Sequence, residues 1–521
     1  MGQTRKEVLE AVSEKYSSDA LNACERVSTG IPVLDELIDG GLPKGEMYVI
    51  NGAPGTGKTI LAMQFLAAGV EAGETTLCLA LSQRVKSVRH TAASAGVLTG
   101  DIAFRDLSRV QDLQALAQQQ TIFDNSAIEL ENTMAAFTKA IDEVQPQRVV
   151  FDGMSHLRML ADDPLMYCQQ LFALRDYLNE KRITAILTAT TQVGNNDHEL
   201  VAIAHGAITL SLRTTAQGVD YRSLHITKIR SSCYQLGEHD MELSKSGIRL
   251  YPCYEGIDAK KDAEQTAEQT IDEVVLSGIE ELDKMLCGGL QRGTSCAILG
   301  ASGTGKTSIS TLFARSYAQQ NGKVAVFLFD ELRGTFLKRS QSLDADVEPL
   351  IHSDQMRLYE ISFGDMTPGK FADMALSAVE EWGAGMVVID TLTGYFNAMP
   401  DQHRLLSRIH ELLMSLNRRG VLTFVIVPQR SISDESAMST AGVSYLADTV
   451  LLLCHFEFEG KMRQAISIYK KRYGGHERSV REVSLRASGV KIGAPLTQLT
   501  GVLSGAPRYT GTQAELIPLH D

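Results

Sequence analysis

Two short glycine-rich segments of the chain share the pattern G-x-x-x-x-G-K-[ST]. The glycines of this pattern let consecutive backbone N–H groups face phosphate oxygens, the lysine contacts the outer phosphates, and the last hydroxyl is a ligand for Mg²⁺. The residues predicted to bind phosphate are Gly52, Ala53, Pro54, Gly55, Thr56, Gly57, Lys58 and Thr59, and Gly300, Ala301, Ser302, Gly303, Thr304, Gly305, Lys306 and Thr307. The sequence therefore predicts two sites for a nucleoside triphosphate.

The surroundings of the two segments repeat as well. Lys58 and Lys306 are 248 residues apart, and so are Gly30 and Gly278 in an upstream motif. In each half an apolar strand precedes the phosphate loop, a helix follows it, and a second strand comes after a glycine turn. The predicted elements are strands 47–50 and 295–299, helices 60–71 and 308–319, and strands 75–81 and 324–329. This order is a βαβ unit, so the chain contains an internal duplication.

Each half then contains an apolar strand that ends in an aspartate, at residues 148–152 and 386–390. An acid at the carboxyl end of a parallel strand beside a phosphate loop holds Mg²⁺ or its water, although such an aspartate can also simply begin a turn. The predicted metal ligands are Thr59, Asp152, Thr307 and Asp390. With further strands at 184–190 and 421–427, the alternation predicts an α/β fold with two tandem P-loop NTPase domains, each a mostly parallel sheet flanked by helices.

The composition also predicts the domain limits. The stretch before residue 273 is rich in Asp, Glu, Lys, Gln, Thr and Ala, which is typical of a solvated linker. We expect a polar N-terminal segment at 1–19, a first domain at 20–255, a linker at 256–272, a second domain at 273–505 and a short tail at 506–521.

Bulk properties exclude several classes of protein. The formal net charge of −13 over 521 residues argues against a broad electrostatic grip on nucleic acid. The eight cysteines include no C-x-x-C pair, which argues against a zinc site and indicates a reducing compartment. The sequence shows no secretory leader and no apolar run long enough to span a membrane, so we expect a cytoplasmic protein.

The duplicated motif G-x-x-x-L-D, followed by G-G-L and a phosphate loop, resembles that of the KaiC circadian-clock ATPases, which have tandem RecA-like domains. The resemblance covers about residues 25–508. It implies a homohexamer of two tiers in which ATP and Mg²⁺ lie between subunits. In the family, a K-x-R segment late in each half reaches the nucleotide of the neighbouring subunit. The matching residues are Lys228, Ile229, Arg230, Lys470, Lys471 and Arg472, with His476 just beyond. Each segment alone could be a solvated turn, and its recurrence in both halves favours the functional interpretation.

The resemblance also points to the reactive half. The family has two glutamates after the strand that follows the first helix, and the first of them is taken as the general base. Here the second half has Asp330 and Glu331, so the predicted catalytic residues are Asp330, Glu331 and Lys306. The first half has Ser82 and Gln83, neither of which is a base at neutral pH. We therefore expect the N-terminal site to bind ATP mainly for hexamer assembly.

The family also phosphorylates itself in its second domain. With Asp448 as the anchor of the comparison, Ser444 and Tyr445 take the places of the modified pair, and Ser439 that of a third family hydroxyl. The resemblance thus implies a serine/threonine autokinase that serves as a phosphorylation-state timer or signalling switch. The alternative is that these residues only form a flexible loop.

The sequence also bears on possible partners and on two alternative functions. The short end after residue 505 argues against a KaiA-like activator, while a KaiB-like partner or signalling proteins stay open. One alternative function is a RecA-like nucleic-acid motor or recombinase, which the scarcity of Lys and Arg in segments 192–199 and 430–435 argues against. The other is a non-catalytic scaffold assembled by ATP, which the pair Asp330 and Glu331 argues against.

Overall fold

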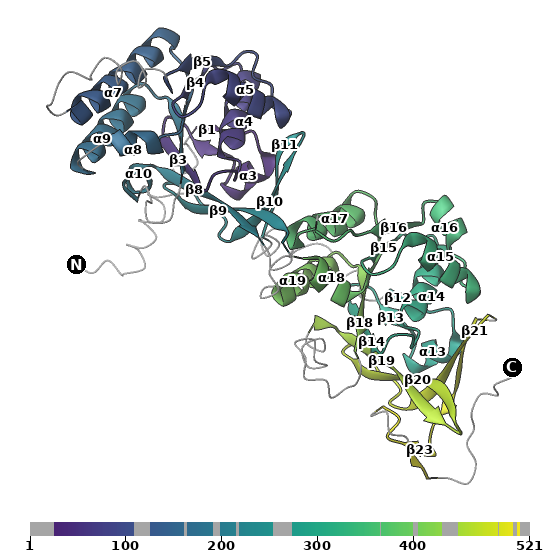
Figure 1. Ribbon diagram of the computed structural model, residues 1–521. Coiled ribbons are helices and arrows are strands. Elements are labelled where there is room, and N and C mark those ends of the chain that lie inside the picture. The colour runs from purple at the N-terminus through teal and green to yellow at the C-terminus, as the bar shows by residue number, and fades with distance from the viewer. Residues whose placement is uncertain are drawn as a thin grey trace, which may run out of the picture. The chain divides into compact units, whose positions relative to one another are not determined.

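The chain divides into two compact units, Met1–Cys253 and Tyr254–Asp521. We describe each unit by itself on a computed structural model (Figure 1). The structure describes residues 25–108, 125–160, 164–190, 198–214, 218–253, 273–364, 366–399, 405–429, 446–487, 489–503 and 508–510. The predicted N-terminal segment 1–19 and linker 256–272 lie outside these residues.

A nine-stranded sheet forms the centre of the first unit, in the order β11-β10-β9-β8-β3-β7-β6-β4-β5. The strands from β8 to β5 in this order are parallel, and β9, β10 and β11 extend the sheet antiparallel beyond β8. The strands are β3 (Met47–Gly52), β4 (Thr76–Ala80), β5 (Ala103–Asp106), β6 (Arg148–Asp152), β7 (Thr184–Thr190), β8 (Gly206–Thr214), β9 (Asp220–Ile229), β10 (Glu238–Ser244) and β11 (Gly247–Tyr251). A short ladder pairs β1 (Arg26–Val27) with β2 (Leu42–Pro43).

Helices cover both faces of this sheet (Figure 1). One face packs against α3 (Pro32–Leu37), α4 (Lys58–Glu71) and α5 (Val85–Ser94), and the other against α7 (Asn125–Val144), α8 (Ser155–Leu160), α9 (Pro164–Glu180) and α10 (His198–Ile203). Neighbouring strand residues point to opposite faces, so Ile50 packs in the core with Phe65, and Val49 packs in the core with Phe137. Two apolar layers therefore fix the plane of the sheet that carries the phosphate loop.

The second unit repeats this topology. Its sheet order is β16-β15-β17-β18-β14-β19-β20-β21-β22, which is the first order read from the other end. The strands are β14 (Ser295–Gly300), β15 (Val324–Leu328), β16 (Met356–Glu360), β17 (Met386–Asp390), β18 (Leu422–Pro428), β19 (Thr449–Phe458), β20 (Lys461–Lys471), β21 (Val480–Arg486) and β22 (Gly489–Pro495). Two short ladders pair β12 (Val274–Val275) with β13 (Leu290–Gln291), and β23 (Leu499–Thr500) with β24 (Arg508–Tyr509). The ladder of β23 and β24 includes part of the predicted tail.

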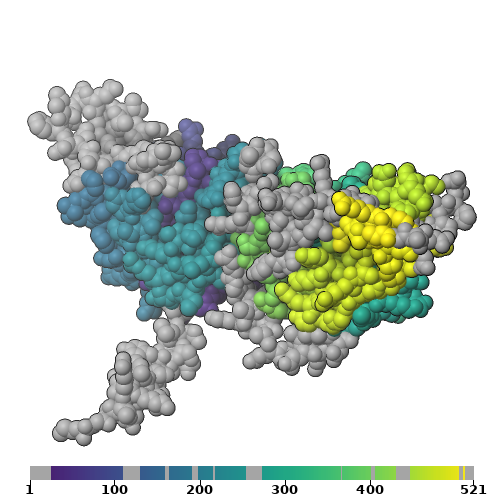
Figure 2. Space-filling view, turned by 90° about the horizontal axis from the view of Figure 1, so that it is seen from below, coloured from purple at the N-terminus to yellow at the C-terminus, as the bar shows by residue number. Residues whose placement is uncertain are grey.

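The second sheet is also covered on both faces (Figure 1). The helices are α13 (Glu280–Met285), α14 (Lys306–Gln319), α15 (Arg333–Ser342) and α16 (Glu348–His352) on one face, and α17 (Pro368–Glu380), α18 (Leu392–Ala398) and α19 (Leu405–Arg418) on the other. The predicted α/β fold with two mostly parallel sheets flanked by helices is confirmed. Figure 2 shows the last strands, coloured yellow, spread over one side of the second unit. None of the helices in the described residues is long and apolar enough to cross a membrane.

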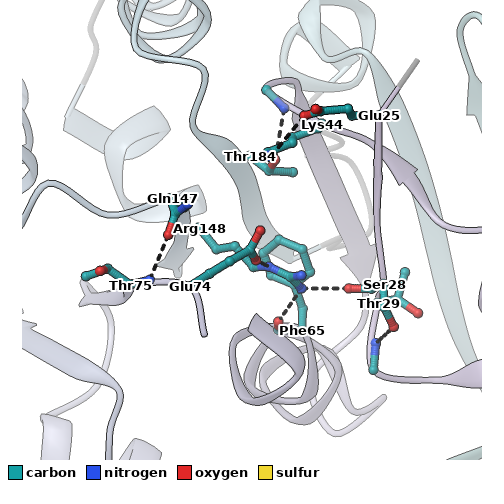
Figure 3. A network of polar contacts seen from close by, with 12 residues as sticks. Glu25, Ser28, Thr29, Lys44, Phe65, Glu74, Thr75, Gln147, Arg148 and Thr184 are labelled. Carbon is teal, nitrogen blue, oxygen red and sulfur yellow. Dashed lines mark hydrogen bonds and ion pairs between the residues drawn. The ribbon is translucent and has the colours of Figure 1, made fainter. Parts of the chain in front are cut away.

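One buried polar network distinguishes the first unit (Figure 3). Arg148 begins β6, and its side chain is only 3% exposed. It pairs with Glu74 and donates to the carbonyl oxygens of Ser28 at 2.7 Å and Phe65 at 2.9 Å. The equivalent residue of the second sheet is the buried Met386, because each begins a strand and pairs with the first residue of a neighbouring strand. Arg148 thus ties α4 and the segment before it to the amino-terminal end of β6.

Candidate nucleotide sites

Both phosphate loops turn from the central strand of a sheet directly into a helix. Gly57 and Gly305 precede the helices with φ of 106° and 95°, in the left-handed region that favours glycine. The ammonium group of Lys58 donates to the carbonyl oxygens of Gly52 at 2.7 Å and Ala53 at 2.9 Å. Lys306 donates to the corresponding Ala301 at 2.7 Å. Each lysine side chain therefore folds back over its own loop, where the outer phosphates of a nucleotide are expected.

Burial perturbs the two lysines. Desolvation lowers the pKa of Lys58, and it lowers the pKa of Lys306 to about 8. The negative charges of Asp152 and Asp390 oppose this effect in the respective sites. A buried ammonium with an incomplete set of anionic neighbours gains most from a polyphosphate, which would stabilise its charged form. The electrostatics of both loops therefore favour a polyanionic ligand.

The predicted metal ligands of the first site lie together. The hydroxyl of Thr59 lies 3.2 Å from both carboxylate oxygens of Asp152. A second hydroxyl, from Thr188 on β7, donates to Asp152 Oδ1 at 2.8 Å. Burial raises the pKa of Asp152, and these two hydrogen bonds oppose the rise. The carboxylate of the first site is thus buried but well satisfied.

The carboxylate of the second site is less well satisfied. Asp390 is 4% exposed, and burial raises its pKa to about 6. The hydrogen bond from Thr307 and the charge of Arg339 oppose the rise, whereas the charge of Glu331 adds to it. Within the described part of the chain, the buried Oδ2 atom of Asp390 has no hydrogen-bond partner. An acceptor in this state costs free energy that a positively charged ligand would recover.

A single replacement accounts for much of this difference. Thr188 pairs with Ile50 in the first sheet, and Ile426 pairs with Ile298 at the equivalent register of the second sheet. Isoleucine has no hydroxyl, so the donor that Asp152 receives from β7 is missing beside Asp390.

Mg²⁺ fits the donors present at both sites. A threonine hydroxyl and an aspartate carboxylate meet in each of them, and Asp390 also keeps an unsatisfied buried oxygen. No group of three or more His, Cys, Asp or Glu side chains that could hold a metal occurs among the described residues. Mg²⁺ usually takes one or two protein ligands and completes its shell with phosphate and water. The donor set therefore fits a metal that arrives with the nucleotide.

The predicted acid pair follows β15, and each acid has its own anchor. Thr391 Oγ1 donates to Asp330 Oδ2 at 2.5 Å, and Arg339 Nη1 forms an ion pair with Glu331 Oε2 at 2.6 Å. The sequence did not reveal either anchor. Arg339 lies eight positions after Glu331, and nothing in that spacing marks it as a functional residue.

The first unit has no acids at these positions. Ser82 and Gln83 follow β4, and Gln83 Oε1 accepts a hydrogen bond from Ser87 at 3.2 Å. Gly153 takes the place of Thr391, directly after the strand-terminal aspartate. A Cβ atom at Gly153 would lie 2.5 Å from the hydroxyl of Ser82. The acid and its threonine anchor are therefore replaced together.

In each sheet, the K-x-R segment and the phosphate loop lie at opposite ends of the strands. Ile229 pairs with Gly206, whereas the loop residue Gly52 pairs with Leu210, four residues further along β8. At about 3.3 Å per residue this separates them by about 13 Å along the strand. The same register separates Lys471 from the second loop. Within each unit, the K-x-R segment and the phosphate loop therefore lie at opposite ends of the strands.

The basic side chains of these segments instead contact backbone carbonyl groups at their own end of the strands. Lys228 and Arg230 both donate to the carbonyl oxygen of Ala202, at 3.1 and 3.2 Å. In the second unit, Lys470 donates to Ala447 at 2.8 Å. Burial lowers the pKa of both Lys228 and Lys470, and a neighbouring arginine adds to the effect in each case. Two cations around one carbonyl leave positive charge available for an anion.

Two other predicted residues complete the second unit. Arg472 forms a 3.0 Å ion pair with Asp448. Burial, followed by the charges of Arg478 and Lys471, lowers the pKa of His476. The predicted phosphoacceptors Ser439, Ser444 and Tyr445 lie outside the described residues, as do most residues of segments 192–199 and 430–435.

The sheet order, the loop at the end of a central strand and the acid at the end of a nearby strand define two tandem P-loop NTPase domains of the RecA-like type. The family model described as KaiC ATPase matches residues 27–255 and 275–497. The chain therefore belongs to the KaiC family of ATPases, as its sequence motifs predicted.

Curated relatives match nearly the whole chain. Circadian clock protein KaiC3 of Synechocystis sp. is 25% identical over 502 residues, which cover 93% of this chain and 95% of the relative. The circadian clock oscillator protein KaiC of Picosynechococcus sp. is 23% identical over 513 residues, covering 94% of each chain. KaiC of Thermosynechococcus vestitus is 24% identical over 505 residues, covering 93% of this chain and 92% of the relative. Family membership makes the chain an ATP-binding ATPase.

Proposed function

We propose that the chain binds ATP at both phosphate loops and hydrolyses it mainly at the second. The acid pair Asp330 and Glu331 carries this proposal, because a carboxylate beside the terminal phosphate can orient and deprotonate the attacking group. Ser82 and Gln83 leave the first site without such a base. The first nucleotide then serves mainly to hold subunits together.

The roles of the other residues follow from their positions. Lys306 contacts the outer phosphates, and Thr307 and Asp390 hold Mg²⁺, as Lys58, Thr59 and Asp152 do in the first site. When bound, Mg²⁺ neutralises charge that develops on the phosphate oxygens. The unsatisfied oxygen of Asp390 supports this assignment.

Neighbouring subunits complete the sites in this proposal. In this proposal, a K-x-R segment, which lies at the other end of the strands from the phosphate loop of its own unit, contacts the nucleotide of another copy. Basic donors from the next subunit would stabilise the charge on the phosphates. This arrangement supports a homohexamer with ATP between its subunits.

The second domain is also proposed to phosphorylate itself. ATP at the second loop of one subunit would transfer its terminal phosphate to Ser444 of the next, with Ser439 and Tyr445 as further acceptors. Several relatives are named as circadian clock proteins, which supports a phosphorylation-state timer or signalling switch. A cytoplasmic location and a KaiB-like partner are part of the same proposal. Phosphopeptide mapping after incubation with ATP and Mg²⁺ tests this step. The absence of phosphate from each of the three residues would refute it.

A comparison of two loop variants tests the division of labour. Lys306→Ala should remove most ATP turnover, whereas Lys58→Ala should keep turnover per assembled ring and weaken the ring itself. Turnover and native mass should be measured on the same samples, with contaminating ATPase excluded. Turnover that persists in Lys306→Ala would show that the second loop is not the main reactive site.

A further inference from the structure

The two acids at the second site have anchors of different kinds, and this difference assigns them different tasks. We infer that Glu331, positioned by Arg339, is the carboxylate that acts on the attacking group, while Thr391 holds Asp330 in a structural role. This inference rests on the proposed hydrolysis at the second loop. It differs from the order that the family resemblance implies, in which the first acid of the pair is the base.

Asp330 is held against the start of α18. Thr391 Oγ1 accepts a hydrogen bond from the backbone N–H of Gly394 at 3.0 Å, so its own hydrogen is free to point at Asp330 Oδ2. A Cβ atom at Gly394 would lie 2.6 Å from that oxygen, which shows how closely the carboxylate approaches the helix. Aspartate is also one methylene shorter than glutamate. Both the anchor and the length restrict its reach toward a nucleotide.

Glu331 is held by a cation on a rigid support. Its side chain is 17% exposed, and its Oε2 atom meets Arg339 Nη1 at 2.6 Å. The guanidinium of Arg339 lies 5.2 Å from the ring centroid of Phe336, which is buried one helical turn earlier on α15. A single ion pair fixes one carboxylate oxygen and leaves Oε1 to accept a proton.

Arg339 has one buried donor atom that its ion pair with Glu331 does not use. Its buried Nη2 atom has no hydrogen-bond partner within the part of the chain that the structure describes. The charges of Arg339 and Glu331 both act on Asp390, so the pair lies within electrostatic range of the proposed metal ligand. A water molecule or a phosphate oxygen at the reacting centre could satisfy this donor. The pair is therefore placed for chemistry as well as for stability.

The first unit has neither partner of the ion pair at the equivalent positions. Helices α5 and α15 begin at equivalent residues, Val85 and Arg333, so Thr91 corresponds to Arg339 as Gln83 corresponds to Glu331. The same fold therefore forms without this ion pair. The Asp330–Thr391 contact is missing from the first unit as well, so the ion pair and this contact both belong to the acid-bearing half.

The step balances without another reactant. Glu331 Oε1 takes the proton of the attacking water or hydroxyl, whose oxygen bonds to the terminal phosphorus of ATP. The bond from that phosphorus to the bridging oxygen breaks, and ADP leaves with the electron pair.

Steady-state kinetics of full-length variants test the inference. Glu331→Gln should lower kcat about 100-fold and Asp330→Asn less than about 3-fold. Arg339→Met should lower kcat about 10-fold with KM and fluorescent-ADP binding nearly unchanged, and Arg339→Lys should recover to within about 3-fold of the parent. Lys338→Met, which removes the adjacent exposed cation, is the matched control and should behave as the parent.

Several outcomes would overturn the assignment. One is an Asp330→Asn variant as slow as Glu331→Gln, and another is an Arg339→Met variant indistinguishable from Lys338→Met. An Arg339→Met variant with raised KM and unchanged kcat would mean that Arg339 binds nucleotide instead. Native mass and thermal unfolding identify variants that fail to assemble, and Arg339→Lys keeps the test decisive in that case. Turnover that survives Lys306→Ala would refute the proposed site itself, separately from these results.

Discussion

The two halves of the chain place nearly the same phosphate loop in two different polar environments. In the first half, Asp152 accepts hydrogen bonds from two hydroxyls, and a buried Arg148 ties a helix to the sheet. In the second half, a buried oxygen of Asp390 has no hydrogen-bond partner among the described residues, and the charges of Glu331 and Arg339 act on this carboxylate. Satisfied polar groups stabilise a fold, whereas unsatisfied ones mark places where a ligand is expected. The comparison suggests one half adapted to holding nucleotide and one to reacting with it.

The largest effect should come from the buried arginine of the first half. Arg148→Met copies the second sheet, yet it leaves Glu74 partly buried without its cation and two carbonyl oxygens without a donor. We expect the free energy of unfolding of the first unit to fall by about 3–5 kcal/mol. Denaturant unfolding followed by hydrogen exchange would measure it. Adding Glu74→Gln should recover part of the loss, and a loss below about 1 kcal/mol would contradict the structural role.

The metal-binding aspartates should differ in activity. Asp390→Asn should reduce ATP turnover about 100-fold, because the amide no longer offers a charged ligand to Mg²⁺. Asp152→Asn in assembled rings should change turnover less than about 3-fold, since the first site contributes little hydrolysis in our proposal. Equal losses in the two variants would remove the distinction between the halves.

Moving the ion pair should sharpen the comparison further. Gln83→Glu together with Thr91→Arg transfers the Glu331–Arg339 pair to the first unit. In a Lys306→Ala background, which silences the second site, we expect turnover to rise about 10-fold. Gln83→Glu alone is the control and should give a smaller rise. No gain from the double variant would show that the first site lacks more than this pair.

The smallest expected effect is a pH dependence of stability. The pKa of Asp390 in the folded chain is about 6, above the unfolded value of about 3.9, so its contribution to stability is fully present below about pH 4 and is lost as the pH rises through 6. Between about pH 5 and 7.5 the second unit should lose about 1 kcal/mol, which is about 2–4 °C in Tm. Thermal unfolding without nucleotide would measure this loss. Asp390→Asn should remove it, and Ile426→Thr, which restores the missing hydroxyl, should reduce it.

The sequence predicted the features that depend on short runs of contiguous residues. The phosphate loops, the strand-terminal Asp152 and Asp390 and the parallel core of each sheet all follow from local patterns, and the structure places them as expected. The antiparallel strands that widen each sheet, and their order, were not predicted.

The differences between the sites were also not visible in the sequence. Thr188 contacts Asp152 only through the register of two strands, and Arg339 reaches Glu331 only because α15 points it there. In the sequence, Arg148 resembles an ordinary surface residue. In the structure it is buried and contacts Glu74 and two carbonyl groups. Such contacts depend on tertiary packing, which a local pattern does not encode.

The opposite placement of the phosphate loop and the K-x-R segment gives each domain a direction. One end of the strands carries the phosphate loop, and the other carries the K-x-R segment, which in our proposal completes the nucleotide site of another copy. Under that proposal copies associate head to tail, and such a contact either closes into a ring or continues as a filament. A copy that has lost only its K-x-R segment would then keep its own loop intact and silence the loop of one neighbour. In mixed assemblies, the loss of nucleotide-site function would then occur in the subunit adjacent to the mutated one.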